Sequence, residues 1–300
     1  MPKKPKKSQP PIQAPGESPA AILSPKYDFV FKLVFGDPDC LSPLEGILRS
    51  ILPWLPKDEF EDITFLDTQR KRLHQEDKLC VLDLCVRLTS GRMVNIEIQL
   101  LPTPGVLNRM QLYNAKMMIE QIRKGQPYET MAQVVTIFIL DHTEFEDEEY
   151  HHEYCLTCRR TGKEFPGSQE IRVLELPKLP KESDGTPLWK WLRFLLAKTR
   201  EEMRTLAQGD EAMTRAVAKV EQASASEKMR RLAFRRQLAE MDMVSRLHGS
   251  REEGREEGRE EGRADAARRM LQEKMPLSKI AALSGLSEAA VKRLAAEKKR

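Results

Sequence analysis

The 300-residue sequence has no apolar run long enough to cross a membrane, and no hydrophobic segment follows its basic start at residues 1–7. A membrane-spanning helix needs about 20 mostly apolar residues, and a secretory signal needs an apolar region behind its positive charges. We therefore expect a cytoplasmic protein with no membrane partner. Residues 1–24, rich in proline and lysine, are expected to form a disordered basic leader.

The chain also has few cysteines and a small net charge. The chain has five cysteines, an odd number, which argues against a disulfide framework and for a reducing compartment. Its formal net charge of +4 is too small to indicate nucleic-acid binding by itself. With 40% hydrophobic residues, the chain has enough apolar side chains for one substantial core and a second, smaller structure.

Residues 81–100 have the pattern of a β-hairpin with one apolar face. Strand side chains alternate between the two faces, and a loop over residues 89–91 with glycine at its third position is a common hairpin connection. That loop sets a register in which apolar residues face each other in three pairs: Leu82 and Ile98, Leu84 and Ile96, and Val86 and Val94. A slip of one residue would move all of them to the other face.

The other face of this hairpin carries two opposed carboxylates. Asp83 lies opposite Glu97, and Gln99 follows on the same face. Like charges directly opposite each other destabilise a sheet. A divalent cation prefers carboxylate oxygens as ligands, and we therefore expect a cation between Asp83 and Glu97.

Helices and strands are expected on both sides of the hairpin. Apolar spacing predicts helices over residues 26–36, 43–52 and 108–123, and strands over residues 61–67, 134–141, 154–159 and 171–176. Residues 187–247 are expected to form two helices. The first of these can pack against the core through five apolar side chains: Trp189, Trp191, Leu192, Leu195 and Leu196.

Residues 251–262 consist of three copies of Arg-Glu-Glu-Gly. On a helix, glutamate and arginine three residues apart can pair, but each glycine costs about 1 kcal/mol of helix stability. The tract therefore predicts a spacer, either helical or frayed and solvated.

The spacing of a helix-turn-helix occurs in the tail, residues 264–300. A small residue, Ala281, is followed by Gly285 and then by Val291. In such a motif the small residue allows close approach of the helices, the glycine makes the turn, and the valine packs the second helix.

Ser287 is expected to cap that second helix, which leaves Lys292 and Arg293 exposed beside the basic residues 298–300. The tail is accordingly predicted either to contact DNA or to form a plain interaction bundle.

Several short segments carry the resemblance to a known family: residues 28–32 (DFVFK), 35–36, 82–83, 91–92 and 96–99 (IEIQ), followed by Arg109, Tyr113, Gln121, Gly125 and Tyr128. From residue 26 to 145 the chain resembles the Rpn family of recombination-promoting nucleases and putative transposases, within the PD-(D/E)XK nuclease superfamily. The resemblance implies an α/β fold, a central mixed sheet flanked by helices, with an α-helical C-terminal extension. It also implies metal-dependent cleavage of DNA with Mg²⁺ as cofactor.

Carried over residue by residue, Asp83 and Glu97 take the two acidic metal-ligand positions. Gln99 stands where the superfamily usually has lysine. A glutamine can hydrogen-bond a water but carries no charge, so catalysis would depend more on the metal. Asp28 would add a further acidic contact from the first helix.

Arg109 and Tyr113 lie four residues apart and so share a helix face. They are expected to line the site and contact a DNA phosphate, the alternative being a surface arginine and a half-buried tyrosine. Two interpretations are also open for Lys32: a lysine that faces a phosphate, and a lysine on the helix surface.

Zinc is the less favoured interpretation of a group of four soft ligands: His151, His152, Cys155 and Cys158. Adjacent histidines on a strand point to opposite faces, and a strand is therefore the better interpretation. The acidic run over residues 144–149 is expected to be a solvated loop.

The expected organisation is a leader, a nuclease-like domain, a helical region, a spacer and a helical tail, over residues 1–24, 25–180, 187–248, 249–263 and 264–300. The expected function is a metal-dependent DNA endonuclease that promotes recombination or transposition. Two alternatives stay open: a catalytically weak or silent DNA-binding or recombination-accessory protein, and a helical protein that forms homo-oligomers through its C-terminal helices.

Overall fold

A computed structural model describes residues 22–67, 69–70, 80–81, 83–167 and 169–297. The chain divides into two compact units, one ending at Arg236 and the other beginning at Gln237. Three parts of the sequence expectations lie outside the described residues: the leader as far as residue 21, Leu82 with its pairing to Ile98, and residues 298–300.

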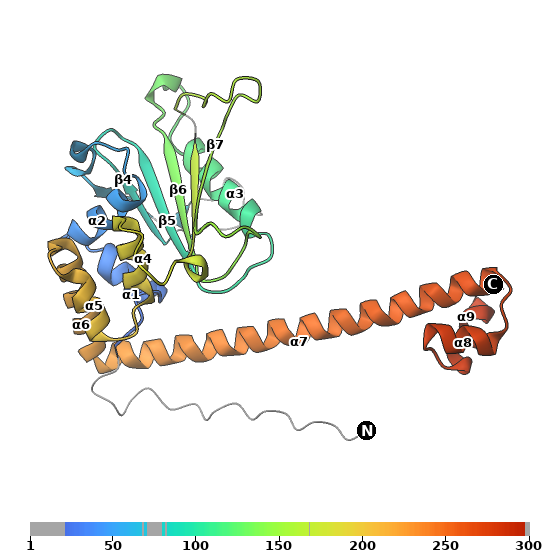
Figure 1. Cartoon of the computed structure of the whole chain (residues 1–300). Helices are drawn as coiled ribbons and strands as arrows, with labels where there is room; N and C mark the ends of the chain where they lie inside the picture. The colour runs from blue at the N-terminus through green and yellow to red at the C-terminus, as the bar shows by residue number, and fades with distance from the viewer. Residues whose placement is uncertain (1–21, 68, 71–79, 82, 168, 298–300) are drawn as a thin grey trace. The chain divides into compact units, whose positions relative to one another are not determined.

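The first unit is built on a mixed sheet of six strands (Figure 1). In spatial order they are β1 (Thr64–Phe65), β4 (Leu84–Arg87), β5 (Met93–Gln99), β6 (Val134–Leu140), β8 (Glu170–Glu175) and β7 (His151–Cys155). The central strands β5, β6 and β8 are parallel, and the outer strands pair antiparallel with their neighbours. The short strands β2 (Gln69–Arg70) and β3 (Cys80–Val81) pair with each other. The predicted α/β fold with a mixed sheet is confirmed.

The hairpin of β4 and β5 has the predicted register. Leu84 pairs with Ile96 and Val86 with Val94, and the loop closes through Gly91, whose φ is +88°. The first strand is shorter than expected, because β4 begins at Leu84. Just before it, the carboxylates of Asp83 and Glu97 accept the N–H groups of Ile98 and Asp83, and the described pairs of the ladder begin at Leu84.

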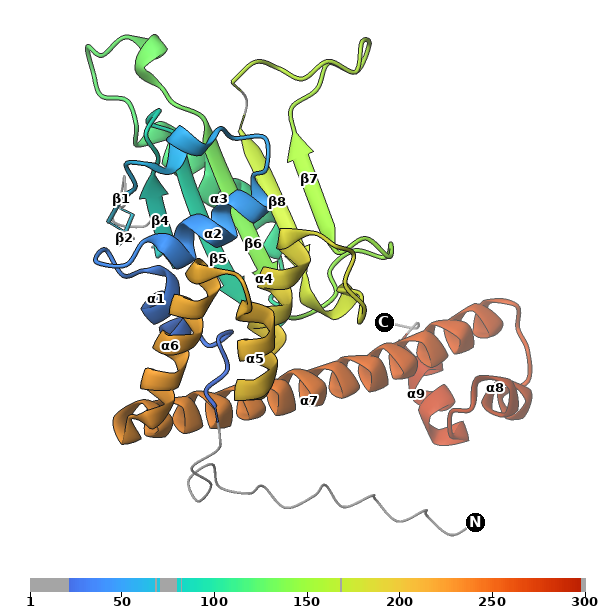
Figure 2. The ribbon, with the colours of Figure 1, turned by 60° about the vertical axis from the view of Figure 1, so that its left-hand side comes forward.

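Helices cover both faces of the sheet (Figure 2). On one face lie α1 (Asp28–Phe35), α2 (Ser42–Ile51) and α4 (Pro187–Leu196), with α5 (Arg200–Ala207) and α6 (Glu211–Ala225) packed against them. Their side chains form one hydrophobic core with Leu84, Ile96 and Ile137 of the sheet. On the other face α3 (Val106–Ile119) packs over β6 and β8. Three 3₁₀ turns complete this unit: η1 (Lys57–Phe60), η2 (Tyr128–Thr130) and η3 (Leu176–Lys178).

The expectation of two helices within residues 187–247 is wrong, because α4, α5, α6 and the start of α7 occupy this segment. Local signals break the helices. Thr199 forms a capping box with Glu202 at the start of α5, and Gly209, with φ of +74°, precedes the N-cap Asp210 of α6. Trp189, Trp191, Leu192 and Leu195 are buried in the core of the sheet, and Leu196 packs against that core.

The second unit consists of most of α7 (Glu227–Gln272), with α8 (Leu277–Ser284) and α9 (Glu288–Glu297). The Arg-Glu-Glu-Gly tract is helical, because α7 runs through it. A small core joins Ala267, Ile280 and Val291. The predicted helical pair is confirmed: Gly285 ends α8 with φ of +69°, and the hydroxyl of Ser287 accepts the N–H of Ala290.

Where the chain is described, we find no helix that combines the length and the apolar character needed to span a bilayer.

Gly46 tests the packing of α2 against α4. A Cβ at this position would lie 2.5 Å from Cζ2 of Trp191. We expect Gly46→Ala to destabilise the first unit by about 1–3 kcal/mol through overpacking, although alanine favours a helix by about 1 kcal/mol over glycine. Urea unfolding followed by tryptophan fluorescence measures this change, because the three tryptophans all lie in the first unit.

The control is Gly258→Ala in α7, where an added Cβ meets nothing within 4 Å. It should leave the fluorescence midpoint unchanged. A Gly46→Ala midpoint at or above that of the parent would contradict the packing described for α2 and α4.

Candidate active site

Asp83 and Glu97 are joined by two hydrogen bonds, in which each carboxylate accepts a backbone N–H at or beside the other residue. The N–H of Asp83 donates to Oε1 of Glu97 over 3.0 Å, and the N–H of Ile98 donates to Oδ2 of Asp83 over 3.2 Å. The two carboxylates therefore lie together where the β4–β5 ladder ends.

Glu97 is a buried acid whose ionised form is disfavoured. The residue is 5% exposed, and burial, followed by the negative charge of Asp83, raises its pKa from 4.5 to about 7. Three weaker effects lower the pKa: the N–H of Asp83, the amide of Asn95 at 3.2 Å and the charge of Arg109. A positive charge placed between the carboxylates would stabilise the ionised pair.

Lys32 already places one positive charge on Asp83. Its Nζ lies 3.0 Å from Oδ1 of Asp83, and the two side chains are 41% and 21% exposed. Water reaches this ion pair, so it contributes at most about 1 kcal/mol to stability. The structure places Lys32 beside Asp83 with a partly exposed side chain, and its contact with a phosphate stays a prediction.

Gln99 is held by its whole amide group. Its Nε2 donates to the carbonyl oxygen of Leu101 over 3.0 Å and to Oγ1 of Thr103, and its Oε1 accepts from Nη2 of Arg109. Gln99 thus ties the turn after β5 to α3. It also holds the guanidinium of Arg109 on the side of Glu97, whose pKa that charge lowers.

Arg109 and Tyr113 share one face of α3, as their spacing predicts. The guanidinium carbon of Arg109 lies 5.7 Å from the centre of the Tyr113 ring, and that ring lies 6.4 Å from the ring of Phe138 on β6. Both residues are half-buried. Their contact with a DNA phosphate stays a prediction.

Asp28 is placed differently from the other predicted site residues. It is the first residue of α1, and its Oδ2 accepts from Nη2 of Arg236 over 3.1 Å. Within the described ranges, no hydrogen bond or ion pair joins Asp28 to Asp83 or Glu97. Lys32, one turn further along α1, makes the contact to Asp83 instead.

A family model matches the chain from residue 25 to residue 250, and this span holds the whole sheet and the Asp83–Glu97 pair. The model describes the PD-(D/E)XK nuclease family transposases. The chain belongs to this family. Neither the curated proteins nor the solved structures gave a match. The resemblance seen in the sequence is confirmed, and membership of a nuclease family supports a hydrolase that acts on DNA.

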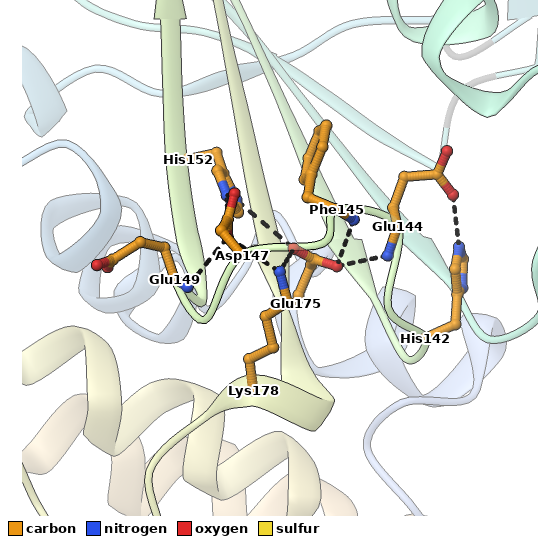
Figure 3. Close-up of polar contacts among 8 residues, drawn as sticks. All are labelled: His142, Glu144, Phe145, Asp147, Glu149, His152, Glu175 and Lys178. Carbon is orange, nitrogen blue, oxygen red and sulfur yellow. Dashed lines mark hydrogen bonds and ion pairs between the residues drawn. The ribbon is translucent and has the colours of Figure 1, made fainter.

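A second group of acidic residues in this PD-(D/E)XK family member lies at the ends of β7 and β8 (Figure 3). Asp147, His152 and Glu175 offer ligand atoms within 4.8 Å of one another. Lys178 supplies a cation there, because its Nζ lies 2.7 Å from Oε2 of Glu175 and 3.1 Å from Oδ1 of Asp147. A metal ion at this position would have to displace the ammonium group.

Glu175 holds a loop in place. Its side chain is fully buried, and its Oε1 accepts the backbone N–H groups of Glu144 and Phe145 over 2.5 and 3.3 Å. A hydrogen bond from His152 lowers the pKa of Asp147 to about 2. The acidic run over residues 144–149 is therefore anchored to β8 at several points and is more than a solvated loop.

The strand interpretation of the four soft ligands is confirmed for three of them. His151, His152 and Cys155 lie in β7, and Cys158 follows in the next loop. The cysteines take no part in the group around Glu175.

Lys292 and Arg293 are exposed on α9, beside the buried Val291. The sequence placed them correctly on the outer face of the second tail helix. Their contact with DNA stays a prediction.

Two neighbours of the carboxylate pair were not expected from the sequence. Asn95 precedes Glu97 by two residues, so strand alternation could have placed it on the same face. The contact of Lys32 had no such signal, because it depends on how α1 packs against the end of β4.

The raised pKa of Glu97 predicts a pH-dependent stability. Because the folded-state pKa of about 7 exceeds the ordinary 4.5, the folded protein holds a proton that the unfolded chain releases, and stability falls as the pH rises between these values. Glutamine mimics the protonated acid. In metal-free buffer, the free energy of unfolding of Glu97→Gln, measured relative to that of the parent, should therefore increase on going from pH 5 to pH 8.5. The expected increase is on the order of 2–3 kcal/mol.

Urea unfolding at the two pH values gives this difference. The exposed Glu129→Gln variant, on η2, is the matched control and should show none. An effect of Glu97→Gln that is equal at both pH values would show that Glu97 ionises normally in the folded protein.

Proposed function

We propose that this protein is a Mg²⁺-dependent DNA endonuclease that promotes recombination or transposition, with Asp83 and Glu97 as its metal ligands. The observation that supports this most is the pair of hydrogen bonds by which each carboxylate accepts a backbone N–H at or beside the other residue, in a member of a nuclease family. One of them is buried, with its pKa raised by the other. Such perturbed pairs are typical of functional sites.

The residues present fit a divalent cation. Two carboxylates converge where a positive charge would relieve their repulsion, and Mg²⁺ is commonly held by one or two carboxylates, with water and substrate phosphate as its other ligands. When bound, the cation supplies Lewis acidity and lowers the pKa of a bound water. The turn after β5 and α3 then determine which side chains face the phosphate.

In the hydrolysis, a water oxygen bonds to phosphorus and the bond from phosphorus to one sugar oxygen breaks. One water proton passes to solvent, and the leaving sugar oxygen takes up a proton. Arg109, oriented by Gln99 and stacked near Tyr113, would hold a non-bridging phosphate oxygen, because guanidinium groups match phosphate geometry. Gln99 acts as the positioning residue for Arg109.

The helical pair of the tail supports a second DNA contact. Lys292 and Arg293 point outward from α9, and each lysine or arginine that reaches a phosphate adds to salt-dependent affinity. We assign these two residues to DNA binding.

Self-association of the chain is also proposed, through α7. Three apolar side chains spaced three residues apart are more than a third exposed on this helix: Leu238, Met241 and Val244. Such a stripe on a long helix suits a second helix of the same kind.

Asp83→Asn and Glu97→Gln should each slow the Mg²⁺-dependent nicking of supercoiled plasmid by at least about a hundredfold, because each removes one anionic ligand. Gel analysis of relaxed and linear plasmid measures the rate, and Glu129→Gln again serves as control.

Parental activity in either variant would refute the metal-ligand assignment. A parent that binds DNA but never cleaves it, with Mg²⁺ or Mn²⁺, would favour the accessory protein. A parent that neither binds nor cleaves DNA would favour the oligomerisation protein.

The double variant Lys292→Ala, Arg293→Ala tests the tail. The slope of log affinity for duplex DNA against log salt should become shallower by up to about 2, because two phosphate contacts are lost. Fluorescence anisotropy over a salt series gives the slope.

The matched control is Arg159→Ala, Arg160→Ala, an exposed adjacent pair in the loop after β7. Equal slopes for the two double variants would show that the tail has no special part in DNA binding.

A further inference from the structure

The motif position held by Gln99 cannot supply the positive charge that the superfamily's usual lysine would bring. A neutral amide has one nitrogen with two N–H groups and one carbonyl oxygen. Both sides of the Gln99 amide are engaged, by Leu101, Thr103 and Arg109. The residue is 7% exposed, and its amide is occupied by these protein partners. An ammonium group at the carboxylate pair would therefore come from another residue of the chain.

Lys32 is placed to supply it. Its Nζ is 3.0 Å from Oδ1 of Asp83. The backbone at Lys32 is fixed, because four other residues of α1 are buried in the core: Val30, Phe31, Val34 and Phe35. At the end of this helix the N–H of Gly36 donates to the carbonyl of Lys32 over 2.8 Å, and a Cβ on Gly36 would come within 2.6 Å of that oxygen.

The tip of Lys32, in contrast, is able to move. Its side chain is 41% exposed, and a lysine carries its charge on a flexible four-carbon stem. A fixed backbone with a mobile ammonium keeps the charge near Asp83 while allowing it to change partner.

We propose that Lys32 is the catalytic ammonium of this site, pairing with Asp83 in the free protein and with the scissile phosphate during cleavage. The proposal rests on the endonuclease function proposed above. Asp83 cannot serve Lys32 and a divalent cation equally, because the two cations repel each other. In this proposal the displaced ammonium pairs with the substrate phosphate and stays protonated throughout, so no proton transfer is assigned to it.

A purely structural Lys32 would behave differently. If it only neutralised Asp83, its removal would free the carboxylate for metal and leave cleavage intact at saturating Mg²⁺. If it acts on the phosphate, its removal strengthens metal binding and weakens cleavage at the same time. The two roles are thus separated by measuring both quantities on one set of variants.

The test uses the full chain with Lys32→Met and Lys32→Arg, and with Lys57→Met as the matched control, an exposed lysine on η1. Mn²⁺ affinity without DNA is measured by electron paramagnetic resonance, and single-turnover plasmid cleavage at saturating Mg²⁺. For Lys32→Met we expect roughly fivefold tighter Mn²⁺ binding and cleavage at least about a hundredfold slower. Lys32→Arg keeps the charge and should retain more cleavage than Lys32→Met, and Lys57→Met should change neither quantity.

Each other result overturns the proposal in a recognisable way. Parental cleavage by Lys32→Met, with cleavage still dependent on Asp83 and Glu97, refutes the role of Lys32 and leaves the endonuclease standing. Unchanged or weaker Mn²⁺ binding by a folded Lys32→Met shows that lysine and metal do not compete for Asp83. A parent that does not cleave at all refutes the endonuclease, and the role of Lys32 with it.

Discussion

The site depends on one constraint just before β4, where two carboxylates each accept a backbone N–H at or beside the other residue. Glu97 accepts the N–H of Asp83, and Asp83 accepts the N–H of Ile98. Glu97 lies in a strand whose seven residues are all buried. Its charge therefore needs nearby donors and cations: the donors come from Asp83 and from Asn95 of β5, and the cations come from two helices.

The cations reach the pair from opposite layers of the fold. Lys32 comes from α1, which packs with the large hydrophobic core, and Arg109 comes from α3 on the other face. A single motif lysine would combine position and charge in one side chain. In the proposed site Gln99 positions Arg109, and the positive charge is divided between Arg109 and Lys32.

The hairpin and the face that carries Asp83 and Glu97 were predictable, because strand alternation and a three-residue glycine loop fix the register. The engagement of Gln99 was not, since its partner Thr103 lies in a turn and Arg109 on a helix whose packing no local pattern determines. The helix break at Thr199 was also predictable, because Thr199 and Glu202 have the spacing of a capping box. The group around Glu175 forms only when β7 pairs with β8, and the sequence held no sign of it.

Two acidic groups compete as the metal site of this nuclease fold, and they differ in their resident cation. At Glu175 a lysine ammonium bridges two carboxylates, whereas Lys32, with a side chain 41% exposed, pairs with one carboxylate among the described residues, that of Asp83. The most direct measurement is the anomalous X-ray signal of Mn²⁺ in crystals of the full chain. We predict a peak between the carboxylates of Asp83 and Glu97. A peak at Glu175 and His152 instead, or none at Asp83, would contradict the assignment.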